Sequence, residues 1–227
     1  MVKIGTEWIQ SYGGTVASLQ HTKAQTEGFR TALLGNPNVQ NAFVVGGQWT
    51  SDEHFEEGPS ESELIERADI VYFSGHGSTA GPIFRSPSTG NDRAALTTEI
   101  RWGNAPGSLL KYVVLDCCFG LGTSPSLYTT VGSDTVERWA GSFRGVRQVL
   151  GFRTACSDES LRGQTFGEYL AAGETIRAAW RKACQETEDS TYQYALLRTS
   201  GSLNDRLGSA TGPAAPSATL YYEWGAC

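Results

Sequence analysis

Two short apolar runs each end in a side chain that can take part in covalent catalysis. Residues 69–77 read Asp-Ile-Val-Tyr-Phe-Ser-Gly-His-Gly and carry His76, and residues 112–118 read Tyr-Val-Val-Leu-Asp-Cys-Cys and end in the thiol of Cys118. β-Branched and aromatic runs that stop abruptly are typical of buried parallel strands, whose carboxyl ends present catalytic groups at one edge of a sheet. A cysteine paired with a histidine is a usable nucleophile at neutral pH, so this pairing predicts covalent catalysis on a carbonyl carbon.

The histidine lies between two glycines, Gly75 and Gly77. Gly77 has no Cβ, so its backbone amide can approach a bound carbonyl oxygen closely and help to stabilise an oxyanion. A lone histidine in a turn is usually structural, but the Gly-His-Gly context and the matching thiol favour a catalytic role for His76. His21 and His54 lie in polar segments without such a setting, and we interpret them as surface residues.

The chain has five cysteines, an odd number whose spacing matches neither a disulfide framework nor a zinc site. Cys117 and Cys118 are adjacent in a predicted strand, so their side chains project to opposite faces. The alternative is that both cysteines are small, buried core residues without a catalytic role. The position of Cys118 at the end of the strand favours an accessible thiol there. The segment between His76 and Cys118 is long enough for a crossover between parallel strands, which would make the two strand ends neighbours.

Length, charge and hydropathy limit the function classes. The 227 residues show no linker, so they predict a single α/β domain over residues 1–227. The net charge of −6, without a basic stripe, argues against a nucleic-acid partner and favours a peptide or protein substrate. No apolar run approaches the roughly 18 residues of a membrane span, and the first residues lack a signal-peptide pattern. We therefore expect no membrane association and a cytoplasmic protein.

Hydrophobic periodicity and turn residues predict alternating strands and helices around these two motifs. Irregular structure between His76 and Lys111, with a short strand at 82–84, is expected to lie beside the site and to carry specificity. Ser60 and Glu63 form a capping-box pattern. The predicted strands are 7–12, 41–46, 69–74, 112–118, 146–152, 192–197 and 219–224, and the predicted helices are 22–34, 61–67, 134–143, 165–172 and 175–187.

The order of the two motifs resembles the caspase-like clan of cysteine peptidases, which includes caspases, metacaspases, legumains and gingipains. The shared pattern is an apolar block ending in His-Gly followed by a second block ending in Asp-x-Cys, and residues 116–118 are especially similar to the metacaspase strand end. The resemblance implies a caspase-like three-layer sandwich with a mostly parallel six-stranded sheet flanked by helices. It also implies that Cys118 is the nucleophile, His76 its partner and Cys117 a buried wall residue. The chain is further similar to an uncharacterised bacterial group of this clan at Glu7-Trp8, Trp139, Gly151-Phe152 and 166–170.

Residues 154–160 are similar to a loop that metacaspases carry after their next strand. In that family, acidic side chains before the nucleophile and in this loop help to form a pocket for Arg or Lys at the cleaved position. Carried over, Asp116 and Asp158 are candidates to hold a guanidinium by charge-assisted hydrogen bonds. The structural alternative for Asp158 is a helix N-cap before Leu161. Phe119-Gly120 departs from the His-Ser-Gly that metacaspases usually have after the nucleophile.

The sequence thus predicts a cysteine endopeptidase that works through a Cys118–His76 dyad and a thioacyl intermediate, with a basic residue as the suggested cleavage position. The backbone amides of Gly77 and Cys118 would form the oxyanion site, and no third residue is marked as an orienter of the histidine. A peptide ligase or cyclase would use the same acyl-enzyme, and a silent binding module would keep only the fold. No cofactor or metal is predicted, since the acidic stretch 52–69 lacks the Asp-x-Asp-x-Asp-Gly spacing of a calcium loop.

Overall fold

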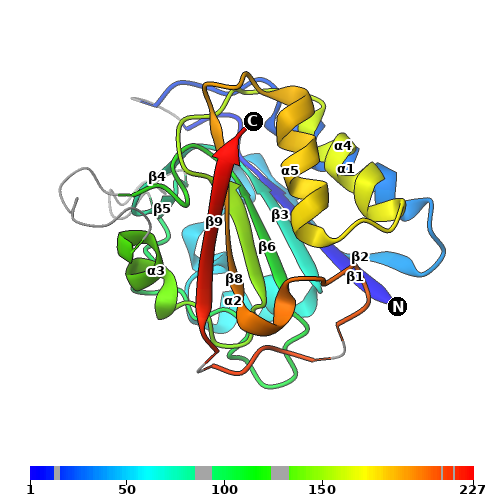
Figure 1. Cartoon of the computed structure of the whole chain (residues 1–227), viewed down its shortest axis with the longest axis vertical. Helices are drawn as coiled ribbons and strands as arrows, with labels where there is room; N and C mark the ends of the chain where they lie inside the picture. The colour runs from blue at the N-terminus through cyan, green and yellow to red at the C-terminus, as the bar shows by residue number, and fades with distance from the viewer. Residues whose placement is uncertain (13–15, 85–93, 124–132, 211, 217) are drawn as a thin grey trace.

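The apolar runs of the sequence become the strands of one mostly parallel sheet. The computed structural model describes residues 1–12, 16–84, 94–123, 133–210, 212–216 and 218–227 (Figure 1). Within these residues the main sheet has seven strands in the order β2-β1-β3-β6-β7-β8-β9. The first five are parallel, and β8 and β9 are antiparallel to their neighbours. The strands are β1 (Val2–Trp8), β2 (Val39–Gly46), β3 (Ile70–Ser74), β6 (Tyr112–Asp116), β7 (Gln148–Phe152), β8 (Gln193–Thr199) and β9 (Leu220–Ala226).

The prediction of a mostly parallel α/β sheet is confirmed, and the expected count of six strands is wrong. Both apolar runs near the end of the chain pair, because β8 adds to β7 and β9 then adds to β8. The first strand also differs from its prediction at 7–12, since β1 begins at Val2 and ends at Trp8. A small hairpin of β4 (Gly77–Ser78) and β5 (Gly81–Pro82) follows the histidine strand.

Helices cover both faces of the sheet (Figure 1), and the sheet separates the hydrophobic core into two clusters. One cluster packs the sheet against three helices and includes Phe29, Phe166 and Trp180. The other lies on the opposite face and includes Trp102 and Trp139. The helices of the first face are α1 (Thr22–Leu34), α4 (Arg162–Ala171) and α5 (Ile176–Thr187), and those of the second are α2 (Pro59–Glu63) and α3 (Ser133–Ala140). No helix in the described part of the chain is long and apolar enough to cross a membrane.

Helix limits follow local chemistry in some places and packing in others. The predicted helix at 22–34 is confirmed without change. The predicted helix at 61–67 is divided, because Leu64 leaves the helical region between α2 and the 3₁₀ turn η3 (Ile65–Arg67). Ser60 lies inside α2 instead of capping it, since Pro59 supplies the fixed φ that suits a first helical position. Helix α4 begins three residues before the predicted start at 165.

The close approach of α1 to α4 depends on glycines. A Cβ at Gly163 would overlap the carbonyl oxygen of Gln25, and a Cβ at Gly167 would lie 2.9 Å from the carbonyl oxygen of Phe29. Neither position leaves room for a methyl group, so only glycine lets the two helix backbones come this near. The contact holds the first turns of the two helices together, and both turns lie beside the carboxyl edge of the sheet.

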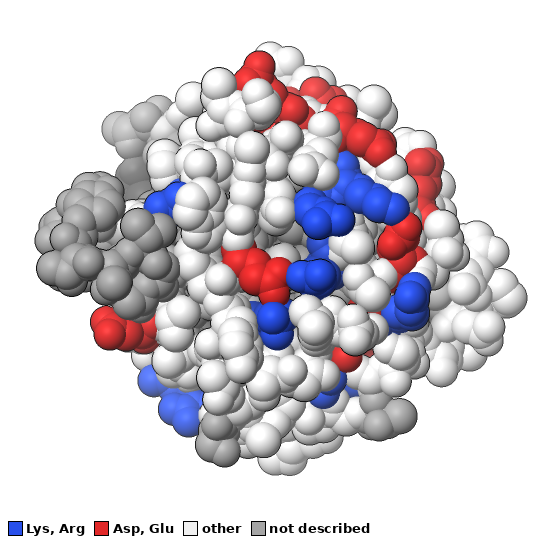
Figure 2. Space-filling view, viewed as in Figure 1, with Lys and Arg blue, Asp and Glu red and all other residues white. Residues whose placement is uncertain are grey.

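The last strand, β9, is an edge strand with charged side chains over it. Figure 2 shows basic and acidic side chains gathered on the face formed by α5 and β9. Glu223 pairs with Arg177 at 2.6 Å and also with Arg198. The Arg153 guanidinium lies 4.0 Å from the ring centroid of Trp224. Charged groups on an edge strand disfavour its pairing with a strand of another molecule.

Candidate active site

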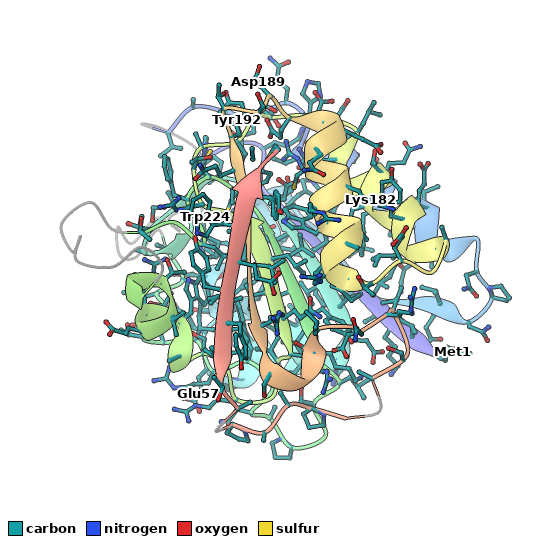
Figure 3. All side chains as sticks on the ribbon, viewed as in Figure 1. Met1, Glu57, Lys182, Asp189, Tyr192 and Trp224 are labelled. Carbon is teal, nitrogen blue, oxygen red and sulfur yellow. The ribbon has the colours of Figure 1, made fainter. Side chains whose placement is uncertain are left out.

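The strand register places His76 and Cys118 at the same edge of the sheet. β3 and β6 are parallel neighbours in which Ser74 lies opposite Asp116, and each candidate residue follows two positions later. In Figure 3 this is the edge marked by Asp189 and Tyr192, away from Met1. His76 and Cys118 line one pocket of about 370 Å³, part of which is open to solvent. The structure thus brings together the two strand ends that the sequence predicted to be neighbours.

The two segments also touch directly through a glycine. A Cβ on Gly77 would lie 2.6 Å from the carbonyl oxygen of Cys118 and even nearer the sulfur of Cys117. A side chain at this position would therefore separate the histidine turn from the thiol turn. Cys117 is fully buried in the core, where burial raises the pKa of its thiol, and Cys118 is partly exposed. The predicted division between a buried Cys117 and an accessible Cys118 is confirmed.

His76 is held on both its backbone and its ring. Nε2 lies 2.8 Å from the carbonyl oxygen of Ala17. A carbonyl only accepts, so Nε2 donates and Nδ1 is the nitrogen that can exchange a proton. The backbone N–H of His76 donates to the Tyr12 hydroxyl at 2.6 Å, and the two rings pack with centroids 4.9 Å apart. The sequence reveals neither partner, because Ala17 acts through its backbone and the apolar pattern predicts Tyr12 as a strand residue.

The sulfur of Cys118 is surrounded by groups of the loop after β7. The backbone N–H of Cys156 donates to Cys118 Sγ at 3.3 Å, and the two sulfur atoms are 3.7 Å apart. The hydrogen bond from the Cys156 thiol is the main cause that lowers the pKa of Cys118 to about 7; burial opposes it, and the Cys156 amide supports it. The same contact raises the pKa of Cys156, whose thiol therefore stays protonated beside a reactive thiolate.

A strained turn follows the candidate nucleophile. Phe119 has a φ of 59°, in the left-handed region, although it carries a large side chain that is 41% exposed. This conformation costs on the order of 1 kcal/mol for a residue with a Cβ. The turn is held by the Phe119 N–H, which donates to the Thr154 carbonyl at 2.8 Å. The N–H of Cys118 donates to no acceptor in the described part of the chain, which leaves it available to a bound oxyanion.

Asp116, one candidate for binding a substrate guanidinium, is already fully occupied. Its Oδ2 accepts from the Tyr72 hydroxyl at 2.6 Å, and its Oδ1 pairs with the guanidinium of Arg162. Burial raises the pKa of Asp116, while the charge of Arg162 and the hydrogen bond from Tyr72 oppose that rise. The carboxylate lines the pocket, but its oxygens face side chains of the same molecule.

Arg162, in the first turn of α4, is the residue that sequence reasoning missed most completely. Its side chain is 0% exposed and pairs with both Asp116 and Glu188. It also donates to the Ser157 carbonyl at 3.1 Å. Nothing in the local sequence marks this arginine, because its partners come from strand β6 and from the end of α5. A buried guanidinium thus sits where the sequence predicted that a substrate guanidinium would bind.

Asp158, the second acidic candidate, lines the pocket and connects two segments at its mouth. Its carboxylate accepts hydrogen bonds from the backbone N–H groups of Gln20 and His21, the latter at 3.1 Å. The alternative of an N-cap for the following helix is wrong, because Leu161 occupies that position and has no side-chain cap. Asp158 instead stabilises the turn before α1. The pocket therefore brings together His76, Cys118 and the two acids, both of which are engaged internally, whereas Gly77 is not among the described residues that line it.

A second histidine differs from its prediction. His54 was interpreted as a surface residue, but its side chain is only 15% exposed and its Nδ1 lies 2.6 Å from Glu7 Oε1. Burial raises the pKa of Glu7, and the other carboxylate oxygen of Glu7 has no partner among the described residues. His54 lies in the turn η2 (Asp52–His54), whose partner β1 is too distant in sequence to reveal the contact. This pair faces the core cluster opposite α1.

The described residues contain no group of three or more His, Cys, Asp or Glu side chains that could hold a metal ion. No curated protein matches the chain. The family described as "Domain of unknown function (DUF6345)" matches residues 6–220. The chain belongs to this family.

Proposed function

We propose that this protein is a cysteine peptidase in which Cys118 is the nucleophile and His76 its acid and base. The observation that carries the proposal is the meeting of a thiol of lowered pKa and a carbonyl-held histidine in one pocket. The pocket lies at the carboxyl edge of parallel strands, where α/β proteins commonly bind ligands. The resemblance of residues 69–118 to the caspase-like clan supports the same assignment.

The proposed reaction uses groups of this chain at each step. His76 Nδ1 takes the proton of the Cys118 thiol, and the thiolate attacks the peptide carbonyl carbon. The backbone N–H groups of Cys118 and Gly77 stabilise the oxyanion. His76 then gives its proton to the leaving amine as the C–N bond breaks, which leaves a thioester on Cys118. Water, deprotonated by His76, attacks the thioester; the C–S bond breaks, and His76 returns the proton to the sulfur of Cys118. The Ala17 carbonyl stabilises the imidazolium each time it forms.

The internal hydrogen bonds of Asp116 and Asp158 affect which substrates the pocket can bind. A substrate guanidinium could reach Asp116 only by displacing Arg162, and breaking a buried ion pair costs about 3–5 kcal/mol. Asp158 would have to release two backbone amides. We therefore expect that the peptidase does not depend on Arg or Lys before the cleaved bond. A peptide library should give products after neutral residues; cleavage confined to basic residues would show that Arg162 moves aside.

The assignment of the nucleophile can be tested with a peptide that carries a thiol-reactive electrophile. Labelling and peptide cleavage are expected in wild type and in Cys117→Ala, and both should be lost in Cys118→Ala. His76→Ala should reduce cleavage by about 10²–10⁴-fold while leaving the thiol in place. Full cleavage by Cys118→Ala would refute the proposal.

Product analysis separates the remaining functions that use the same fold. Mass spectrometry in the presence of a peptide amine should show hydrolysis products; a dominant joined product would assign a ligase or cyclase to the same thioester. If wild type neither reacts with the electrophile nor cleaves any library member, the protein is a binding module and the peptidase proposal fails.

A further inference from the structure

The pocket contains a second thiol that forms no covalent bond in the proposed peptide cleavage. Cys156 lies on the loop after β7, and its sulfur is 3.7 Å from that of Cys118. Two hydrogen bonds hold the loop against the Cys118 turn, one from Cys156 N–H to Cys118 Sγ at 3.3 Å and one from Phe119 N–H to the Thr154 carbonyl at 2.8 Å. A disulfide has an S–S length of about 2.05 Å, so the sulfurs need to approach by roughly 1.6 Å.

We propose that Cys118 and Cys156 are a peroxide-responsive pair that closes to an intramolecular disulfide. The bond joins the turn after β6 to the loop after β7 and blocks the sulfur of Cys118. Disulfide formation requires only the two thiols, and its consequence for peptide cleavage rests on the proposed function.

The two sulfurs have complementary chemistry for this reaction. Cys118, with its lowered pKa, supplies the thiolate that attacks one oxygen of hydrogen peroxide; the O–O bond breaks, and hydroxide leaves and is protonated to water. Cys118 is then a sulfenic acid. The sulfur of Cys156 attacks it, its proton goes to the departing hydroxide, and a second water is released. Two thiols are oxidised by two electrons, and one peroxide is reduced to two waters.

The other cysteines do not line this pocket. Cys117 is next to Cys118 in the chain, but its sulfur is fully buried in the core cluster that also contains Trp139. Cys184 lies on the buried face of α5 and pairs with Cys227, a partly exposed thiol whose pKa the hydrogen bond with Cys184 lowers. Neither lines the pocket that holds Cys118 and Cys156. The Cys118–Cys156 pair is therefore the one that a small oxidant reaches through this pocket.

The test is peptide mapping of the full chain after treatment with one equivalent of hydrogen peroxide. Trypsin separates the two cysteines because Arg138 and Arg153 lie between them. Wild type should give a linked pair of peptides that dithiothreitol separates. The link should persist in Cys117→Ala and disappear in Cys118→Ser.

Cys156→Ser provides the decisive comparison, because it keeps a hydrogen-bond donor and removes the second sulfur. In excess hydrogen peroxide, applied equally to wild type, its Cys118 should consume one peroxide to become the sulfenic acid and a second to become the sulfinic acid, so that dithiothreitol recovers at least about tenfold less free Cys118 than in wild type. Equal loss of Cys118 in the two proteins, without a linked peptide in wild type, would overturn the inference. A link that survives in Cys118→Ser would overturn it as well. No peptide substrate enters this measurement, so a failure of the peptidase proposal leaves its result unchanged.

Discussion

The reactivity of Cys118 depends on atoms of the facing loop. The largest effect on its pKa is the hydrogen bond from the Cys156 thiol, and the backbone N–H of Cys156 adds to it. Both contacts stabilise the thiolate, while burial favours the neutral thiol. Lowered thiol pKa values are a mark of reactive cysteines, because the thiolate is the nucleophile.

The first prediction concerns the pH dependence of Cys118 alkylation. In wild type the rate should rise with pH to a midpoint of about 7, because the thiolate forms above that value. Cys156→Ala removes the donor and should shift the midpoint upward, whereas Cys156→Ser keeps a donor and should shift it less. The measurement is the rate of iodoacetamide modification at Cys118, followed by mass spectrometry between pH 5 and 10. Coincident profiles for Ala and Ser would show that the donor does not control the thiol.

Tyr12 positions the histidine turn through one hydroxyl. Tyr12→Phe keeps the ring against His76 but leaves the backbone N–H of His76 without its acceptor. We expect a loss of about 1–3 kcal/mol in the free energy of unfolding and a slower reaction of the peptide electrophile. Tyr221→Phe is the matched control, since Tyr221 is 45% exposed and lies near the start of β9, at the edge of the sheet away from the pocket. Similar denaturant midpoints for the two variants would remove Tyr12 from this role.

At the scale of elements, the contact between α1 and α4 sets the position of the pocket wall. Gln25, in α1, lines the pocket, and its carbonyl oxygen is the atom that a Cβ on Gly163 would overlap. The backbones of the two helices therefore fix how far Gln25 lies from the sheet edge. Alanine favours a helix by up to about 1 kcal/mol over glycine, but this gain cannot offset a steric overlap with backbone.

Gly163→Ala should therefore lower the free energy of unfolding by about 1–3 kcal/mol, because α4 must move away from α1. Gly35→Ala is the control: no atom lies within 4 Å of its Cβ position and its φ is −63°, so it should be neutral or stabilising by about 0.4–1 kcal/mol. Urea denaturation of both variants checks the prediction. A stabilised Gly163→Ala would mean that the helices are less tightly packed than described.

At the scale of the whole molecule, two buried ionic groups bind distant parts of the chain. Arg162 connects β6, α4 and α5 through Asp116 and Glu188, and His54 connects η2 to β1 through Glu7. Buried ion pairs add little stability compared with apolar packing, but removing one partner is costly because the other charge is left alone. Stability as a function of pH should therefore report on these groups.

His54→Ala leaves Glu7 buried without its partner. Burial already raises the pKa of Glu7 above its ordinary value, so the folded state prefers the protonated acid and loses stability as pH rises above the unfolded pKa of about 4.5. In His54→Ala the free energy of unfolding should therefore fall steeply between pH 5 and 8. At pH 7 it should be about 3–5 kcal/mol lower than in wild type. The double variant Glu7→Gln, His54→Ala should show a flatter dependence of stability on pH than His54→Ala, and it should be more stable than His54→Ala at pH 7. Parallel pH profiles of the two variants would refute a role for the buried carboxylate.

The sequence was informative where the determining interactions are local. The limits of α1 and the order of strands ending in His76 and Cys118 follow from hydrophobic periodicity and turn residues. The orientation of His76 could not be predicted, since the Ala17 carbonyl has no side-chain signal. The pairing of Asp116 with Arg162 joins residues 46 positions apart, so no local pattern reveals it. The contact of Cys156 with Cys118 likewise depends on the path of a loop.

The alignment of β3 with β6 has an evolutionary corollary. Ser74 and Asp116 lie side by side, and the candidate residues each follow after one intervening residue. Inserting or deleting a single amino acid in either short turn would move one reactive group away from the other. Homologues that keep the chemistry should therefore vary in the connection from β5 to β6 while conserving the length of both turns.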